Sequence, residues 1–229
     1  MKSISILLVF KIIAVFNSSL YSQENTLALN DFDPVLFNGR RYSFNLSNTI
    51  QGHPYIFTPE FELGYVMIRG RLFEGVLLNY DIYNQGLVMK YKNLNDLYDF
   101  MILSDAWIDE FKIHDKKFEM KETGEGQKGY FQVIGQDGLK VLYYWQKKLI
   151  LSRQPGNTDY YLSEATRTMY LQIDEELFRF RNNRNFVNFF NPEKKELINK
   201  YLKKNRINVK KVPDELMLNL LTHINQAGN

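Results

Sequence analysis

The sequence predicts an α+β protein, with an antiparallel β-meander over about residues 40–173 followed by a helical segment over about residues 183–226. In the first region, short runs of apolar and aromatic residues alternate with turn-forming residues. In the second, apolar residues recur at helical spacing after two proline-containing helix starts. Such a meander is expected to form a curved sheet, an open barrel or a sandwich.

The meander is predicted from a series of hairpins, each with a short polar turn between two strand-like runs. Tyr42, Phe44 and Leu46 alternate with polar residues at its start. Gln136-Asp137-Gly138 is the strongest of the later turn signals, because Asp-Gly favours tight hairpin turns. Strands joined by such short connections are antiparallel. The expected strand pairs are 65–69 with 72–78, 77–82 with 87–91, 107–113 with 118–121, and 130–134 with 139–145; runs at 160–162 and 169–173 flank a further polar stretch.

Two segments interrupt the hairpin pattern. The segment 94–103 carries apolar residues at the spacing i, i+3, i+4 and i+7, which fits a helical turn, but a strand fits it equally well. The segment 123–128 is rich in glycine and charged residues, so we expect it to form a loop between strands.

The helical segment is predicted to contain two or three helices. A short helix over 183–190 comes first, and Asn191-Pro192-Glu193 then supplies an N-cap, a first-turn proline and a first-turn acid. Pro213-Asp214-Glu215 starts a further helix in the same way. No linker-like stretch precedes these helices, so residues 23–229 are expected to form a single α+β domain. The apolar stripes of the two longer helices are Leu197, Ile198, Tyr201 and Leu202, and Leu216, Met217, Leu220, Leu221 and Ile224.

Residues 1–22 have the layout of a secretory signal peptide. Lys2 supplies a positive charge, an apolar run extends from Ile4 to Phe16, and a polar stretch leads to the expected cleavage site after Ser22. The apolar run is too short for a comfortable membrane span. The chain has no cysteine, so it can carry neither a disulfide nor the lipid-modified cysteine of a lipoprotein. We therefore expect export to the periplasm or cell surface, without a membrane span after cleavage.

A basic cluster follows the predicted β-meander. The whole chain has a formal net charge of +3, and loss of Lys2 and Lys11 with the signal peptide would leave +1. Local clustering therefore matters more than total charge. Such a cluster fits an anionic envelope component or another envelope protein as partner, although a solvated helix face has the same composition. Nucleic acid is not expected outside the cell. The candidate binding residues are Lys194, Lys195, Lys200, Lys203, Lys204, Arg206, Lys210 and Lys211.

The sequence lacks a recognisable catalytic or metal-binding motif. Its histidines, His53, His114 and His223, are far apart in the sequence, whereas zinc sites are often built from closely spaced ligands. Nucleophile signatures and the Gly-x-x-x-x-Gly-Lys phosphate-binding loop are missing as well. Gly124-x-Gly126-x-x-Gly129 has the form of a dinucleotide-binding string, but it does not open a helix after a parallel strand, so a hairpin loop is the preferred interpretation. We therefore expect no metal site and no cofactor.

Carboxylates are the remaining enzymatic candidates, because glycoside hydrolysis needs two of them facing each other across a cleft. Asp81 stands out, since Asn79-Tyr80-Asp81 ends a predicted strand just before a turn. An aspartate in that position also serves as a turn cap through hydrogen bonds to nearby backbone amides. The carboxylates that lie near aromatic residues in the sequence are Glu60, Glu62, Asp81, Asp105 and Asp109.

The order of several short motifs resembles a family of uncharacterised exported β-meander proteins from Bacteroidetes-type Gram-negative bacteria. The motifs are the segments Gly52–Tyr55, Gly64–Asn79, Tyr80–Ile82 and Gly129–Phe131, and the resemblance continues through the lysine-rich helix and the last helix. It implies an exported protein of a Gram-negative bacterium. It implies no activity and no functional residues.

Three functions remain open from the sequence. The first is a non-catalytic exported binding or accessory protein of the cell envelope. The second is a carboxylate-dependent, glycan-active enzyme. The third is a lipocalin-like carrier of an apolar ligand, which would need a closed barrel with an open interior.

Overall fold

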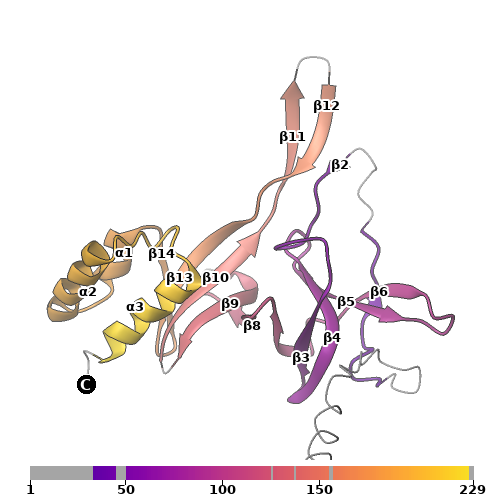
Figure 1. Ribbon diagram of the computed structural model, residues 1–229, viewed down its shortest axis with the longest axis horizontal. Coiled ribbons are helices and arrows are strands. Elements are labelled where there is room, and N and C mark those ends of the chain that lie inside the picture. The colour runs from indigo at the N-terminus through magenta and orange to yellow at the C-terminus, as the bar shows by residue number, and fades with distance from the viewer. Residues whose placement is uncertain (1–32, 45–49, 125, 137, 155–156, 227–229) are drawn as a thin grey trace, which may run out of the picture.

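The computed structural model describes residues 33–44, 50–124, 126–136, 138–154 and 157–226, and the predicted signal peptide lies outside these ranges. The described residues form an antiparallel sheet of eleven strands, a second sheet of three strands and three helices (Figure 1). The α+β prediction is therefore confirmed. The strands are β1 Arg40–Arg41, β2 Ile50–Gln51, β3 Glu62–Ile68, β4 Arg71–Asp81, β5 Gly86–Lys92, β6 Tyr98–Ile102, β7 Ile108–Ile113, β8 Lys116–Glu122, β9 Lys128–Gln136, β10 Leu139–Gln146, β11 Leu149–Gln154, β12 Asn157–Leu162, β13 Thr166–Ile173 and β14 Glu176–Phe180.

The four predicted hairpins are all present as β3–β4, β4–β5, β7–β8 and β9–β10. In the β3–β4 turn both Arg69 (φ 52°) and Gly70 (φ 74°) are left-handed, which is the backbone conformation of the tight turns that join antiparallel strands. His114 and Asp115 adopt it in the β7–β8 turn. Short turns of this kind match the right-handed twist of the strands they connect.

The large sheet departs from a simple meander at one place. Its strand order is β1-β6-β5-β4-β3-β7-β8-β9-β10-β13-β14, so β7 pairs with β3 and not with β6. The outer edge of β6 is occupied by β1, where Arg40 lies opposite Ile102, whereas the outer edge of β3 accepts β7. The segment 94–103, for which the sequence allows either a helical turn or a strand, contains strand β6. Leu94 and Leu97 lie in the turn before β6, and their exposed fractions are 77% and 63%.

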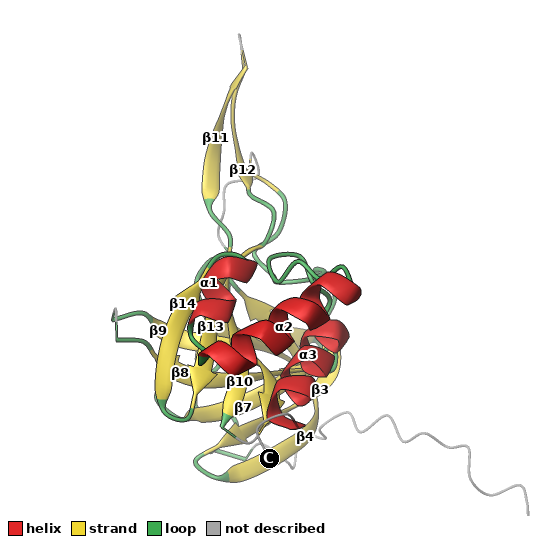
Figure 2. Ribbon diagram, turned by 90° about the vertical axis from the view of Figure 1, so that its left-hand side faces the viewer, coloured by secondary structure: helices red, strands yellow, loops and turns green. Residues whose placement is uncertain are grey.

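A two-stranded arm made of β11 and β12 projects from the large sheet (Figures 1 and 2). The predicted run 160–162 belongs to the arm and does not pair with the run 169–173, because β12 pairs with β11 and β13 pairs with β10. Ile50 in β2 pairs in parallel with Tyr160 of β12 and completes the small sheet. The arm and the final strand β14 were not among the predicted hairpins.

Side chains fill the interior of the curved sheet. The rings of Tyr80, Phe111, Phe118 and Tyr130 are fully buried, and each ring contacts at least two of the others at centroid distances of 4.8–5.8 Å. Aliphatic side chains of β3, β4, β5 and β7 surround this cluster. The sheet therefore encloses a packed core, which does not favour the carrier hypothesis.

The helices cover one face of the last strands of the large sheet (Figure 2). They are α1 Asn183–Asn188, α2 Pro192–Lys204 and α3 Asp214–Gln226. The predicted N-cap of α2 is confirmed, since the Asn191 side chain accepts a hydrogen bond from the backbone amide of Lys194 (2.9 Å). In the predicted apolar stripe of α2, Ile198 and Leu202 are buried, and they pack against apolar residues of α3 and of β10, β13 and β14.

A polar network joins the helical layer to the curved sheet. At the start of α3, the Asp214 carboxylate accepts hydrogen bonds from the Gln132 amide (2.7 Å) and from the Lys116 ammonium group. Gln132 is only 2% exposed and also accepts a hydrogen bond from the Trp145 indole (2.8 Å). Trp145 packs against the apolar cluster inside the curved sheet and against the one beneath the helices. Strands β8, β9 and β10 and helix α3 are therefore fixed through one carboxylate.

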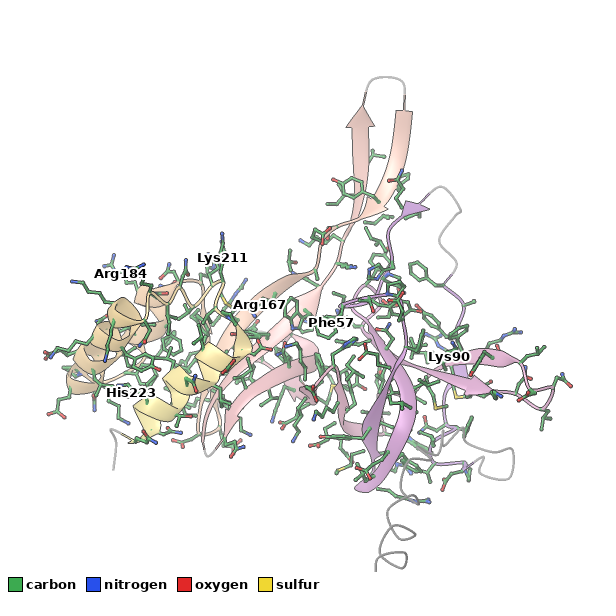
Figure 3. The ribbon with its side chains drawn as sticks, viewed as in Figure 1. Phe57, Lys90, Arg167, Arg184, Lys211 and His223 are labelled. Atoms are coloured by element: carbon green, nitrogen blue, oxygen red, sulfur yellow. The ribbon has the colours of Figure 1, made fainter. Side chains whose placement is uncertain are left out.

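Arg167 of β13 reinforces the same junction (Figure 3). Its guanidinium group lies 3.9 Å from an Asp214 oxygen and 3.9 Å from the centroid of the Tyr143 ring. It also donates to the backbone carbonyl of Val212 (3.2 Å), just before α3. Because the arginine is largely buried, stacking and hydrogen bonds together hold its charge in place.

Replacing Asp214 by alanine is expected to lower the free energy of unfolding by about 2 kcal/mol, because Gln132 and Lys116 would lose a shared acceptor. Glu215→Ala is the matched control, since Glu215 is an exposed acid in the same first turn of α3. Urea denaturation of both variants separates the network from the helix-dipole effect that the two acids share. Equal losses would contradict the role assigned to the network.

Candidate functional site

Asp81 is a fully buried turn cap at the end of β4. Its Oδ1 atom accepts hydrogen bonds from the backbone amides of Tyr83 (2.9 Å) and Asn84 (2.8 Å). Its Oδ2 atom accepts from the Asn84 side chain (2.8 Å) and from the Tyr42 hydroxyl (2.7 Å). The carboxylate is thus surrounded by four donors, as in the turn-cap interpretation of the sequence, and it also fixes a residue distant in the chain.

Asn79 anchors a second segment on the same face of β4. It is 1% exposed, and its side-chain amide donates to the backbone carbonyls of Thr58 (2.9 Å) and Glu60 (2.8 Å). Side chains alternate across a strand, so Asn79 and Asp81 share one face while Tyr80 enters the aromatic core. The end of β4 therefore holds both the 58–60 segment and Tyr42 in place over the outside of the sheet.

These anchored segments form an open groove of about 940 Å³ against β6. Tyr55 contacts Phe61 edge-on at 5.5 Å between centroids, and Phe61 contacts Phe100 at 5.2 Å. Tyr98 is 50% exposed, and the Lys90 ammonium lies 4.2 Å from the centroid of its ring. The aromatic residues that line the groove are Tyr42, Phe44, Tyr55, Phe61, Tyr98 and Phe100.

Two cations and two carboxylates share the groove with these rings. Arg41 and Asp99 form an ion pair at 3.6 Å, while Lys90 and Glu60 complete the charged lining. A hydrogen bond from the Thr58 side chain lowers the pKa of Glu60, so this carboxylate is ionised at neutral pH. Burial raises the pKa of Tyr42, helped by the nearby Asp81 carboxylate, which keeps its hydroxyl protonated as a donor.

The other carboxylate candidates make separate contacts. The Asp109 carboxylate accepts a hydrogen bond from the backbone amide of Gly70 (2.6 Å) in the β3–β4 turn. Glu62 pairs with His114 (2.8 Å) across neighbouring hairpins. Desolvation raises the pKa of Asp105, to which the Tyr130 hydroxyl donates (3.2 Å). Of the five candidates, Glu60 alone lines the groove, beside Asp99, which sequence reasoning did not select.

The predicted basic residues lie on α2 and on the connection between α2 and α3. Lys194 and Lys195 are half-buried, whereas the other six are exposed. Lys200 and Lys204 border a shallow depression of about 620 Å³, whose lining includes Tyr201 and His223 stacked at 4.4 Å. Among the described residues, Lys200 is the only one of the eight in an ion pair, with Glu196 (2.8 Å).

The eight basic residues are called the basic surface from here on. Lys203 and Lys204 occupy the last turn of α2, where cations also stabilise the helix dipole. Lys211 projects on the same side of the helical layer as Arg184, another cation of this region (Figure 3). Lys90 and the groove lie near the other end of the long axis of the molecule (Figure 3). The two candidate sites are therefore well separated.

The three histidines lie on different elements. His53 is in the loop before the 54–56 segment, His114 is in the β7–β8 turn, and His223 is on α3. Within the described ranges, no cluster of three or more histidines and carboxylates could hold a metal ion. In the same ranges, none of the helices has the length and apolar character needed to cross a membrane.

The chain matches no protein-family model, no curated protein and no solved structure. The argument for binding therefore rests on the geometry of the groove and of the basic surface.

Asp81→Ala is expected to lower the free energy of unfolding by about 2–4 kcal/mol, because the donors that surround the carboxylate would lose their hydrogen-bond acceptor. Asp109→Ala should cost less than about 1 kcal/mol, since Asp109 caps an exposed turn. Thermal and urea unfolding would compare the two. Unchanged stability in Asp81→Ala would rule out the anchoring role.

Proposed function

We propose that the protein is a non-catalytic, exported binding or accessory protein of the bacterial cell envelope, which attaches through its basic surface to an anionic envelope component. The supporting observation is the concentration of charge on the helical layer. Residues 194–211 contain eight basic residues and one acid, Glu196. Six of the eight cations are exposed. A surface of this kind attracts phosphate groups, whether on a lipid or on a lipopolysaccharide.

The export part of the proposal rests on residues 1–22 and on the family resemblance. The absence of cysteine in the chain fits attachment through non-covalent contacts. Electrostatic attachment meets this need, because each lysine near an anionic membrane surface contributes about 1 kcal/mol.

The enzymatic alternative has less support from the geometry. A glycosidase needs one carboxyl with a raised pKa to protonate the leaving group. In the groove, the pKa of Glu60 is lowered and Asp99 is paired with Arg41. Asp105 has a raised pKa but does not line the groove. The two carboxylates of the groove, Glu60 and Asp99, are therefore better suited to accepting hydrogen bonds from a ligand than to acid catalysis.

The triple variant Lys200→Ala, Lys203→Ala and Lys204→Ala should bind vesicles of phosphatidylcholine and phosphatidylglycerol about 100-fold more weakly than the unchanged protein. Co-sedimentation with these vesicles, with pure phosphatidylcholine vesicles and with purified lipopolysaccharide distinguishes lipid from lipopolysaccharide phosphates. Raised salt should weaken binding of the unchanged protein.

The matched control is the variant Lys112→Ala, Lys128→Ala and Lys148→Ala, which removes two lysines from strands β7 and β9 and one from the β10–β11 connection. It lowers the net charge by the same amount and should retain most of the binding. Equal losses in both triple variants would show that total charge, and not the basic surface, drives attachment. Absence of binding to every anionic preparation would contradict the proposal itself.

A further inference from the structure

The groove beside β6 presents a different chemistry from the basic surface. Its lining combines aromatic side chains with charged groups of both signs. Arg41 and Lys90 are balanced by Glu60 and Asp99, so the groove has no formal net charge. Like-charge contacts oppose binding of a strongly anionic or cationic ligand. The charge balance therefore favours a neutral ligand.

The ligand must also match a lining that is aromatic and polar at once. An entirely apolar ligand would displace water from the four charged groups and offer them no hydrogen bonds in return, which costs binding energy. A pyranose ring avoids this cost, because it has apolar C–H faces and a rim of hydroxyl groups. Carboxylates accept hydrogen bonds from such hydroxyls, and a guanidinium group donates to them.

We propose that this groove binds a neutral glycan chain. Sugar rings stack on Tyr98 and Phe44, and the chain hydroxyls bond to Glu60, Asp99 and Arg41. The groove is open to solvent, so a bound chain need not be enclosed by the protein. This site lies outside the basic surface and does not depend on the proposed attachment to an anionic component.

The aromatic walls are held before any ligand arrives. The Tyr42 hydroxyl is fixed on the buried Asp81 carboxylate (2.7 Å). The backbone of Tyr55 forms an isolated β-bridge with the same residue. Asn79 fixes the segment that carries Glu60. These contacts hold the part of the lining formed by Tyr42, Tyr55 and Glu60, and preorganised groups lose little conformational freedom on binding.

The experiment is isothermal titration with cellohexaose, xylohexaose, maltohexaose and chitohexaose, with polygalacturonate as an acidic comparison. The unchanged protein should bind at least one neutral oligosaccharide, with little dependence on salt. Tyr98→Ala should weaken that binding by about tenfold, and Tyr98→Phe should retain it because the ring face remains. Asp99→Asn should weaken it as well, through loss of a charged acceptor.

Tyr161→Ala is the matched control, since Tyr161 is a partly exposed tyrosine on the arm (39%) and not in the groove. It should bind as the unchanged protein does, and so should the triple lysine variant of the basic surface. Failure to bind any of the neutral oligosaccharides would overturn the inference. So would salt-sensitive binding to polygalacturonate alone, or equal binding by Tyr98→Ala. None of these results depends on whether the basic surface binds vesicles.

Discussion

The end of β4 is the constraint on which the outer face of the curved sheet depends. Alternation of side chains sends Tyr80 into the aromatic core and turns Asn79 and Asp81 to the opposite face. Buried polar groups need partners, and these two find them in Tyr42 and in the 58–60 segment. The position of the groove is thus determined by three consecutive residues, of which Tyr80 packs in the core while Asn79 and Asp81 form hydrogen bonds on the outer face.

A second polar network, around Asp214, fixes the position of the helical layer, as the polar residues of β4 fix the segments that line the groove. Two apolar cores lie on either side of Trp145, and the Asp214 network fixes the position of α3 relative to the sheet. Apolar packing alone is not directional, whereas hydrogen bonds from Gln132 and Lys116 to a single carboxylate are. The network therefore orients the helices that carry the basic surface.

Local signals explain what could be predicted from the sequence. Tight turns such as Arg69-Gly70, and the N-cap at Asn191, depend on a few adjacent residues, so the hairpins and helix starts were predicted from pattern alone. The pairing of β7 with β3, and of β6 with β1, joins strands that are not consecutive in the chain. That is a long-range property, invisible to periodicity. The sequence does not predict the groove for the same reason, because Glu60 and Asp99 come together only in the folded chain. Asn79-Tyr80-Asp81 is the only local sequence feature that points to this part of the molecule.

The two proposed sites favour a role that links two different materials. The groove has balanced charges and suits a neutral polymer, while the basic surface has a large excess of cations and suits phosphate groups. Their ligands differ in charge and their positions differ in space, so occupation of one site does not block the other. Attachment through one site raises the effective concentration of ligand at the other without any change in either site. A modest affinity of each site is then enough to hold a glycan chain close to an anionic surface.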